Sequence, residues 1–444
     1  MRSAGLILTV VVAVVGSALG AAAQSTDSPS AETTEVGVTS KEIRIAVIAD
    51  VDNAAVPGLF VGVPNAVKGF AKYINNSCRP KNTCLAGRKV VVDFIDSHLS
   101  NTDARNAVIT ACSRDFAIVG TAALFLNNVD DMVACEDRSG APTGIPDLPA
   151  LTTEVAQQCS PVSYPINPSQ LDCTTKDEHP QTWRVNRGAV RYYLRTRSKD
   201  LHGIFVYGND LKSASIATLV VARGDQAGGV ESDGEIGISS LAPQSAFTPV
   251  VQKMKTEKSN YALNAGTFST GIALRKEAKL QGLDPKKIVW DCFSNCYDER
   301  LIEQGGADVE GQYVTLTHLP FTETKSNKAL KNYVKFTGKD KIDGLGVYAW
   351  VATLLFRDAV NAIVEKGGNN ALTRKALLDE LATISSFDAD GMWGATNVAE
   401  RVPSPCFLVL QVKDGEFVRV YPKKPGTLDC KSSNAIRIKE DLLE

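Results

Sequence analysis

The sequence IRIAVI at residues 43–48 and the sequence GIFVY at residues 203–207 each open a series in which strand and helix patterns alternate. Short apolar runs rich in β-branched and aromatic residues are typical of parallel strands that are buried on both faces. Repeated strand–helix units predict a parallel sheet with helices on both faces. Two successive series therefore predict an α/β protein with two doubly wound lobes.

The expected elements follow from the same patterns along the whole chain. A hairpin is expected at the C-terminal end, because Asp414-Gly415 separates two apolar runs. Asn101 or Thr102 is the expected N-cap of the second helix. The expected strands are 43–48, 89–95, 116–119, 182–185, 203–207, 235–239, 261–265, 287–291, 311–317, 407–412 and 417–421. The expected helices are 63–73, 102–112, 127–138, 189–197, 211–223, 247–257, 270–281, 299–304, 327–336, 346–365 and 373–383.

The N-terminus predicts export. Arg2 precedes an apolar run at 6–15, and Ala21-Ala22-Ala23 supplies a small-residue cleavage site, so residues 1–23 are expected to be a signal peptide. The alternative is an uncleaved membrane anchor. Residues 24–36 are rich in Ser, Thr and Ala and are expected to form a flexible leader. No cysteine follows the apolar run, so a lipid-attachment site is not expected.

Ten cysteines, all after residue 23, support an oxidising compartment, because an exported chain with an even number of cysteines is typically disulfide-bonded. The alternative for Cys292 and Cys296 is a metal or redox site, but a cysteine-only zinc site needs four ligands and no second close pair is evident. We expect no metal and no cofactor. Sequence leaves the connectivity open. Pairing nearest neighbours gives Cys78–Cys84, Cys112–Cys135, Cys159–Cys173, Cys292–Cys296 and Cys406–Cys430.

Composition and motifs exclude several classes of function. The 444 residues carry a formal charge of −2 and are 44% hydrophobic, which is typical of a folded protein and gives no support for nucleic acid as a partner. The sequence has no glycine-rich phosphate loop, no nucleophile elbow and no zinc-protease motif. Asp50, Asp52, Asp93 and Asp96 lie at expected strand ends, where a carboxylate either faces a cleft or is a solvated loop residue.

The order of several short segments resembles the solute-binding proteins of ABC importers, which have the type I periplasmic-binding fold. The similarity is greatest to the leucine/isoleucine/valine-binding type, and it runs over nearly the whole chain after the leader. A disulfide around the helix after the third strand is also familiar in this group and fits Cys112–Cys135. The segments are 38–48 (VTSKEIRIAVI), 69–75 (GFAKYIN), 117–120 (AIVG), 274–282 (LRKEAKLQG), 306–311 (GADVEG), Tyr348-Ala349, 387–391 (FDADG) and 412–418 (VKDGEFV).

The resemblance implies two lobes joined by three crossovers near Asn186, Pro320 and Pro403, with a ligand cleft between the lobes. The expected domains are 37–186 plus 320–403 for the N-terminal lobe, and 187–319 plus 404–430 for the C-terminal lobe. Ligands of open α/β sheets lie beyond the carboxyl ends of the strands. The implied ligand-binding residues are Thr121, Ala122, Phe125, Asp147, Leu148, Thr267, Phe268, Phe293, Ser294 and Tyr348.

These positions depart from the amino-acid-binding members. Small hydroxyl residues usually hold the ligand carboxylate, but residues 121–125 read TAALF. The Tyr and acidic residue that usually meet the ammonium are replaced by Thr267 or Phe268 and by Phe293 or Ser294. Because a buried charge needs a partner, these departures favour an apolar or aromatic ligand over a simple branched-chain amino acid.

The resemblance therefore implies a monomeric, extracytoplasmic solute-binding protein that delivers a small molecule to a membrane ABC permease. A ligand-sensing module of a signalling system is the alternative within the same fold. A secreted hydrolase is the third hypothesis, and the missing nucleophile–base constellation counts against any enzyme.

Overall fold

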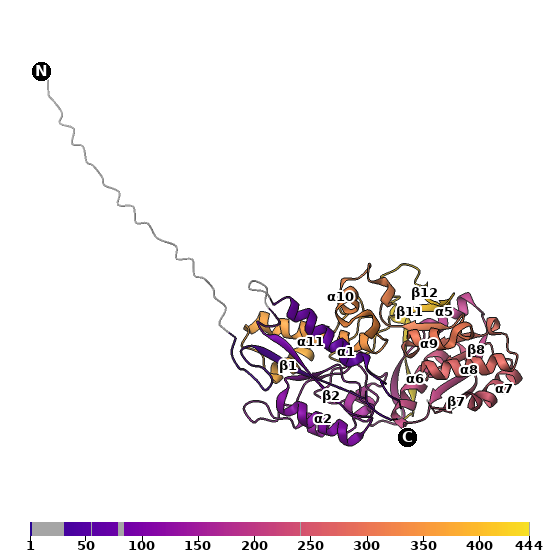
Figure 1. Ribbon diagram of the computed structural model, residues 1–444, viewed down its shortest axis with the longest axis horizontal. Coiled ribbons are helices and arrows are strands. Elements are labelled where there is room, and N and C mark those ends of the chain that lie inside the picture. Colours follow the sequence, from indigo (N-terminus) through magenta and orange to yellow (C-terminus); the bar gives the residue numbers. More distant parts are fainter. Residues whose placement is uncertain (2–30, 55, 79–83, 240, 444) are drawn as a thin grey trace.

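The computed structural model describes Met1 and residues 31–54, 56–78, 84–239 and 241–443. The expected signal peptide after Met1, and the expected leader up to residue 30, lie outside the described residues. The described chain forms two lobes, one holding α1, α2 and α11 and the other holding α6 to α9 (Figure 1). The prediction of a two-lobed α/β fold is confirmed.

The N-terminal lobe is built on a parallel sheet with the strand order β2-β1-β3-β4. Ile45 and Val47 of the central strand β1 join the core formed with α1 and α11, while Ala46 and Ile48 join the core formed with α2. A strand covered on both faces needs an apolar sequence without alternation. The elements are β1 Glu42–Ala49, α1 Gly62–Asn76, β2 Lys89–Asp96, α2 Asn101–Arg114, β3 Ala117–Val119, α3 Asp130–Val133, β4 Asp147–Leu148, α4 Val155–Gln158, α10 Lys328–Thr337, α11 Gly346–Gly367 and α12 Arg374–Leu381.

The C-terminal lobe repeats this arrangement with the parallel strand order β7-β6-β8-β9. Phe205 of the central strand packs with Tyr193 of α5, and Val206 packs with Val250 of α7, so this sheet is also covered on both faces. The elements are α5 Gly188–Thr196, β6 Leu201–Gly208, α6 Lys212–Gly228, β7 Val230–Ile238, α7 Thr248–Glu257, β8 Tyr261–Asn264, α8 Phe268–Leu280, β9 Val289–Cys292 and α9 Glu299–Gly305.

Two small antiparallel sheets lie outside the parallel ones. β10 Tyr313–Leu316, β11 Leu408–Lys413 and β12 Glu416–Tyr421 form the first, and β11 and β12 are joined by a hairpin. Asp414 and Gly415 at its turn have φ angles of 51° and 75°, as the Asp-Gly signal predicts. The second sheet pairs β5 Gln181–Asn186 with the C-terminal strand β13 Ala435–Glu440.

Helix α11 is the centre of the largest core. Trp350 is fully buried and its ring contacts Phe70 at 6.0 Å, Tyr73 at 5.9 Å and Tyr333 at 5.5 Å between centroids. Among the described residues, this helix is the one whose length and hydropathy would allow a membrane span, but 72% of its apolar window is buried inside the protein. Its apolar sequence is therefore explained by packing.

Five disulfide bonds join all ten cysteines in nearest-neighbour pairs along the chain. They are Cys78–Cys84, Cys112–Cys135, Cys159–Cys173, Cys292–Cys296 and Cys406–Cys430. The described residues contain no group of three His, Cys, Asp or Glu side chains arranged to hold a metal ion.

Two local expectations were wrong, and one strand was missed. The helix expected at 127–138 is limited to α3 because the chain leaves it at Ala134 and enters the Cys112–Cys135 disulfide. The N-cap of α2 is Ser100, whose hydroxyl accepts from the Asp103 N–H at 3.3 Å. Strand β13 was not expected; it pairs with β5 over its whole length, and there the Trp183 indole N–H donates to the Glu440 carbonyl at 3.0 Å.

Candidate functional site

A hydrogen bond between the lobes marks the predicted site. Tyr348, near the start of α11, is 4% exposed, and its hydroxyl donates to Oγ of Ser294 at 2.8 Å. Ser294 follows β9 in the C-terminal lobe, at the start of a short 3-10 turn. Burial raises the pKa of the Tyr348 phenol, so it stays protonated and able to donate. Two residues predicted from the sequence are thus brought together by the fold.

Tyr348 belongs to a group of rings that we call the hinge aromatic cluster. Its centroid lies 4.7 Å from that of Trp393 and 5.9 Å from that of His318, both in edge-on geometry. Tyr297 and Phe321 complete the cluster, 4.7 Å apart, and the Tyr297 hydroxyl accepts from the Phe321 N–H at 2.8 Å. The cluster therefore joins ring side chains from distant parts of the chain.

Sequence reasoning missed four members of this cluster. The crossover expected near Pro320 could have indicated two of them, because a crossover at that point would place the neighbouring His318 and Phe321 beside the lobe boundary. Trp393 gave no such signal, because the bridge between His318 and Trp393 joins two segments that are far apart in the sequence.

On the N-terminal lobe, Thr121 and Ala122 after β3 and Asp147 and Leu148 in β4 are fully buried. Asp147 accepts hydrogen bonds from the hydroxyl of Thr121 at 2.7 Å, the amide of Gln157 at 3.0 Å and the hydroxyl of Ser163 at 2.9 Å. Burial raises the pKa of the Asp147 carboxyl, and these bonds oppose that effect. Ala122 and Leu148 are each 0% exposed. In this structure, Thr121 and Asp147 bond to each other within the lobe.

Asp50 positions the loop that carries Phe125. Its carboxylate accepts from the Ser97 hydroxyl at 2.6 Å and from the N–H groups of Leu99 and Leu124, each at 2.8 Å. Asp50 is 0% exposed, so its interpretation as a solvated loop carboxylate was wrong. Phe125 itself is half-buried at the end of this loop.

On the C-terminal lobe, the predicted residues lie at the carboxyl ends of β8 and β9. Thr267 is the N-cap of α8 and accepts from the Thr270 N–H at 3.3 Å. The Arg300 guanidinium lies 4.7 Å above the centroid of the half-buried Phe268 ring. Phe293 is also half-buried and is held by the turn that the Cys292–Cys296 disulfide closes. Among the described ring contacts, Phe125, Phe268 and Phe293 do not stack on the hinge aromatic cluster.

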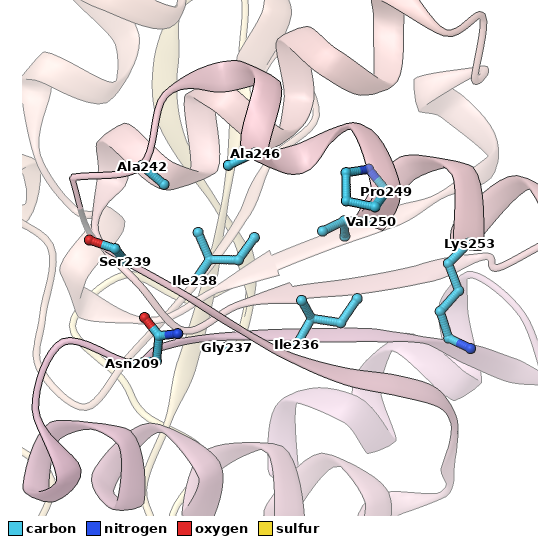
Figure 2. A pocket seen from close by; sticks show the side chains of 10 residues that line it. All are labelled: Asn209, Ile236, Gly237, Ile238, Ser239, Ala242, Ala246, Pro249, Val250 and Lys253. Carbon is cyan, nitrogen blue, oxygen red and sulfur yellow. The ribbon is translucent and has the colours of Figure 1, made fainter.

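A separate cavity of about 550 Å³ lies between β7, α7 and the segment before α7. Figure 2 shows apolar side chains such as Ile236, Ile238 and Val250 along it, with Asn209 and Ser239 at one end and Lys253 at the other. None of the ten predicted ligand-binding residues lines this cavity.

The sequence matches the model of a known protein family. A sequence model described as periplasmic binding protein matches residues 42–416, which include both parallel sheets. The chain belongs to the periplasmic binding protein family. This membership confirms the resemblance found in the sequence and the expectation that the chain is not an enzyme. A periplasmic binding protein works outside the cytoplasm and binds small solutes, in agreement with the coarse prediction of function and location.

Solved structures share the fold of this periplasmic binding protein at low sequence identity. A leucine-binding protein from Thermotoga maritima has a TM-score of 0.63 at 15% identity, covering 85% of this chain and 97% of its own. A fatty acid ABC transporter substrate-binding protein from Thermomonospora curvata has a TM-score of 0.64 at 16% identity, covering 88% and 97%. A solute-binding protein from Rhodopseudomonas palustris in complex with 4-hydroxybenzoate has a TM-score of 0.62 at 11% identity, covering 86% and 96%. A sequence comparison with curated proteins found no match.

Proposed function

We propose that this periplasmic binding protein captures a small apolar or aromatic solute between its lobes and delivers it to a membrane ABC permease. The observation that carries the proposal is the 2.8 Å hydrogen bond from Tyr348 to Ser294, because it brings residues of both lobes together beside the hinge aromatic cluster. Binding sites that are mostly apolar with a few polar anchors suit such a solute.

The proposal also covers the residues of each lobe, the location of the protein and its oligomeric state. We propose lobes of 37–186 plus 320–403 and of 187–319 plus 404–430, with crossovers near Asn186, Pro320 and Pro403. β13 then extends the C-terminal end beyond residue 430. We further propose an exported monomer without lipid attachment, and no partnership with nucleic acid.

The chemistry of the site counts against a simple branched-chain amino acid. The hydroxyl of Thr121 donates to Asp147 within the N-terminal lobe. None of Thr267, Phe268, Phe293 and Ser294 is acidic, so these positions offer no anion to a ligand ammonium group. A buried zwitterion without paired partners is strongly disfavoured. The solved structures named for a fatty acid and for 4-hydroxybenzoate show that this fold also serves apolar acids, which supports the proposed ligand class.

A thermal-shift screen tests the ligand class. Because a ligand that binds only the native state stabilises it by mass action, a solute at about 100 times its Kd should add about 2.7 kcal/mol of stability. We expect aromatic acids or fatty acids to raise the melting temperature of the purified protein by several degrees, and leucine and valine to leave it unchanged. Strong stabilisation by leucine or valine would contradict the proposed ligand class.

Substitutions at both lobes test the site. We expect Phe268→Ala and Tyr348→Ala to weaken binding of the best solute from the screen by about tenfold or more, with a smaller loss of stability, because each removes a ring at the lobe boundary. Tyr348→Phe keeps the ring and removes the bond to Ser294, and it should cost about 1 kcal/mol of binding free energy. Calorimetric titration measures the affinity. Tyr333→Phe, a buried tyrosine that donates to the Asp343 carbonyl, is the matched control that leaves affinity unchanged. Parallel loss of binding and stability would make Phe268 and Tyr348 core residues only.

A further inference from the structure

His318 occupies the centre of the hinge aromatic cluster. It lies just after β10 and is 0% exposed. Its ring is nearly parallel to those of Trp393 and Phe321, at interplanar angles of 8° and 18° and centroid distances of 6.1 Å and 5.9 Å. The edge-on contact with Tyr348 at 5.9 Å places the imidazole next to the residue that bonds across the lobes.

The hydrogen bonds of His318 define the state of each ring nitrogen. Nδ1 lies 2.9 Å from the carbonyl oxygen of Leu319, which can only accept, so Nδ1 carries the proton. Burial lowers the pKa of His318 to about 4, so the ring is neutral at pH 7. Nε2 is then a hydrogen-bond acceptor with an available lone pair.

Nε2 of His318 is buried and has no hydrogen-bond partner among the described residues. Most buried polar atoms of native proteins are paired, and an unpaired one calls for an explanation. Here the unpaired atom lies in a group of aromatic rings beside the proposed ligand contact, where a bound ring could stack and present a donor.

We propose that His318 is a ligand-binding residue whose Nε2 accepts a hydrogen bond from the hydroxyl group of an aromatic acid. The inference rests on the proposed function and narrows its ligand class from aromatic solutes to hydroxylated ones. A carboxylate cannot be the group that meets Nε2, because both are acceptors. The ring of the ligand enters the hinge aromatic cluster while the lobes are apart, and the bond between Tyr348 and Ser294 forms again when the lobes close over it.

The test compares two probes that differ by one hydroxyl group. Calorimetric titration of the wild-type protein with 4-hydroxybenzoate and with benzoate should show a preference of about tenfold or more for the hydroxylated probe, because the probe without it leaves Nε2 unpaired. His318→Asn keeps a donor near the position of Nδ1 for the Leu319 carbonyl and lacks the distal acceptor, so the preference should fall below about threefold. His318→Gln places an acceptor near the position of Nε2 and should restore part of it.

The outcomes separate the inference from the function on which it rests. His202→Asn, at a histidine that pairs with Asp233 in the C-terminal lobe at 2.9 Å, is the control that keeps the full preference. Equal affinity of the wild-type protein for the two probes, or an equal loss of both in a folded His318→Asn variant, overturns the role of His318 alone. Failure of both probes to bind the wild-type protein overturns the aromatic ligand class and the inference with it.

Discussion

Replacing Arg374 with alanine is expected to lower the free energy of unfolding by about 3–5 kcal/mol, because the substitution leaves several buried acceptors unpaired. Arg374 is the first residue of α12 and is 0% exposed. Its guanidinium donates to the carbonyls of Cys112 at 2.7 Å, Asp115 at 2.6 Å and Glu136 at 2.6 Å. One side chain thus ties α12 to the end of α2 and to the segment after α3.

Urea denaturation followed by circular dichroism measures this loss. Lys375→Ala is the matched control, because the neighbouring Lys375 is exposed and pairs with Asp379 on the helix surface, at 2.6 Å. Such pairs contribute little, and the control should change stability by less than about 0.5 kcal/mol. Arg374→Lys should recover only part of the loss, since a single ammonium cannot reach all the carbonyls. A loss below about 1 kcal/mol for Arg374→Ala would contradict the prediction. It would show that the local backbone rearranges so that the buried carbonyls find other hydrogen-bond donors.

Stability is also expected to fall as the pH rises from about 4.5 to about 7, because of a buried pair of carboxyl groups in the C-terminal lobe. The Tyr261 hydroxyl lies 2.7 Å from a carboxyl oxygen of Asp225 and 3.0 Å from one of Asp291. The Tyr261 hydroxyl has one proton and can donate it to only one of these two carboxyl oxygens. The arrangement therefore favours a second proton, bound to one of the two carboxyl groups. Tyr193 donates to Asp291 at 2.9 Å and makes Asp225 the better holder of that proton.

The direction of the pH effect follows from these protons. Burial raises the pKa of Asp291 to about 7 and that of Asp225 well above its usual value. In the unfolded chain both groups lose their protons near pH 4. The folded state therefore binds more protons between these limits, and stability decreases with rising pH by at most about 1.4 kcal/mol per pH unit for each proton retained. Asp115, whose pKa burial raises to about 7, acts in the same sense as the pair. His318, whose pKa burial lowers to about 4, acts in the opposite sense between about pH 4 and pH 6.5 and offsets about one proton, and the hydrogen-bonded Asp172, whose pKa is lowered, opposes the pair at lower pH.

Urea midpoints measured from pH 4.5 to pH 8 test this prediction. Asp225→Asn cannot ionise and should reduce the slope by about one proton, whereas Asp130→Asn, an exposed control, should not change it. Asp291 directly precedes Cys292 and accepts its N–H at 2.9 Å, so the pair lies at the base of the turn that carries Ser294. A wild-type stability that is constant or rises across this pH range would contradict the extra proton.

The sequence predicted most elements because their patterns are local. The run at 43–48 became β1 Glu42–Ala49, and the run at 203–207 became β6 Leu201–Gly208. The expected helix 346–365 became α11 Gly346–Gly367, whose burial explains its apolar sequence. The shortened α3 and the additional β13 were missed, because a disulfide and a distant strand partner decided them.

For the candidate site as well, part could be predicted from the sequence and part depended on the tertiary structure. Repeated strand–helix patterns sufficed to predict the two lobes, and the resemblance of short segments sufficed to predict the family, whereas the involvement of Ser294 and Tyr348 in ligand binding stays a prediction. Only the tertiary structure decided which side chains meet: Thr121 with Asp147 inside one lobe, and His318 with Trp393 and Tyr348 at the lobe boundary. Periodicity is set by neighbours in the chain, whereas hydrogen bonds and ring contacts depend on distances between residues far apart in the sequence.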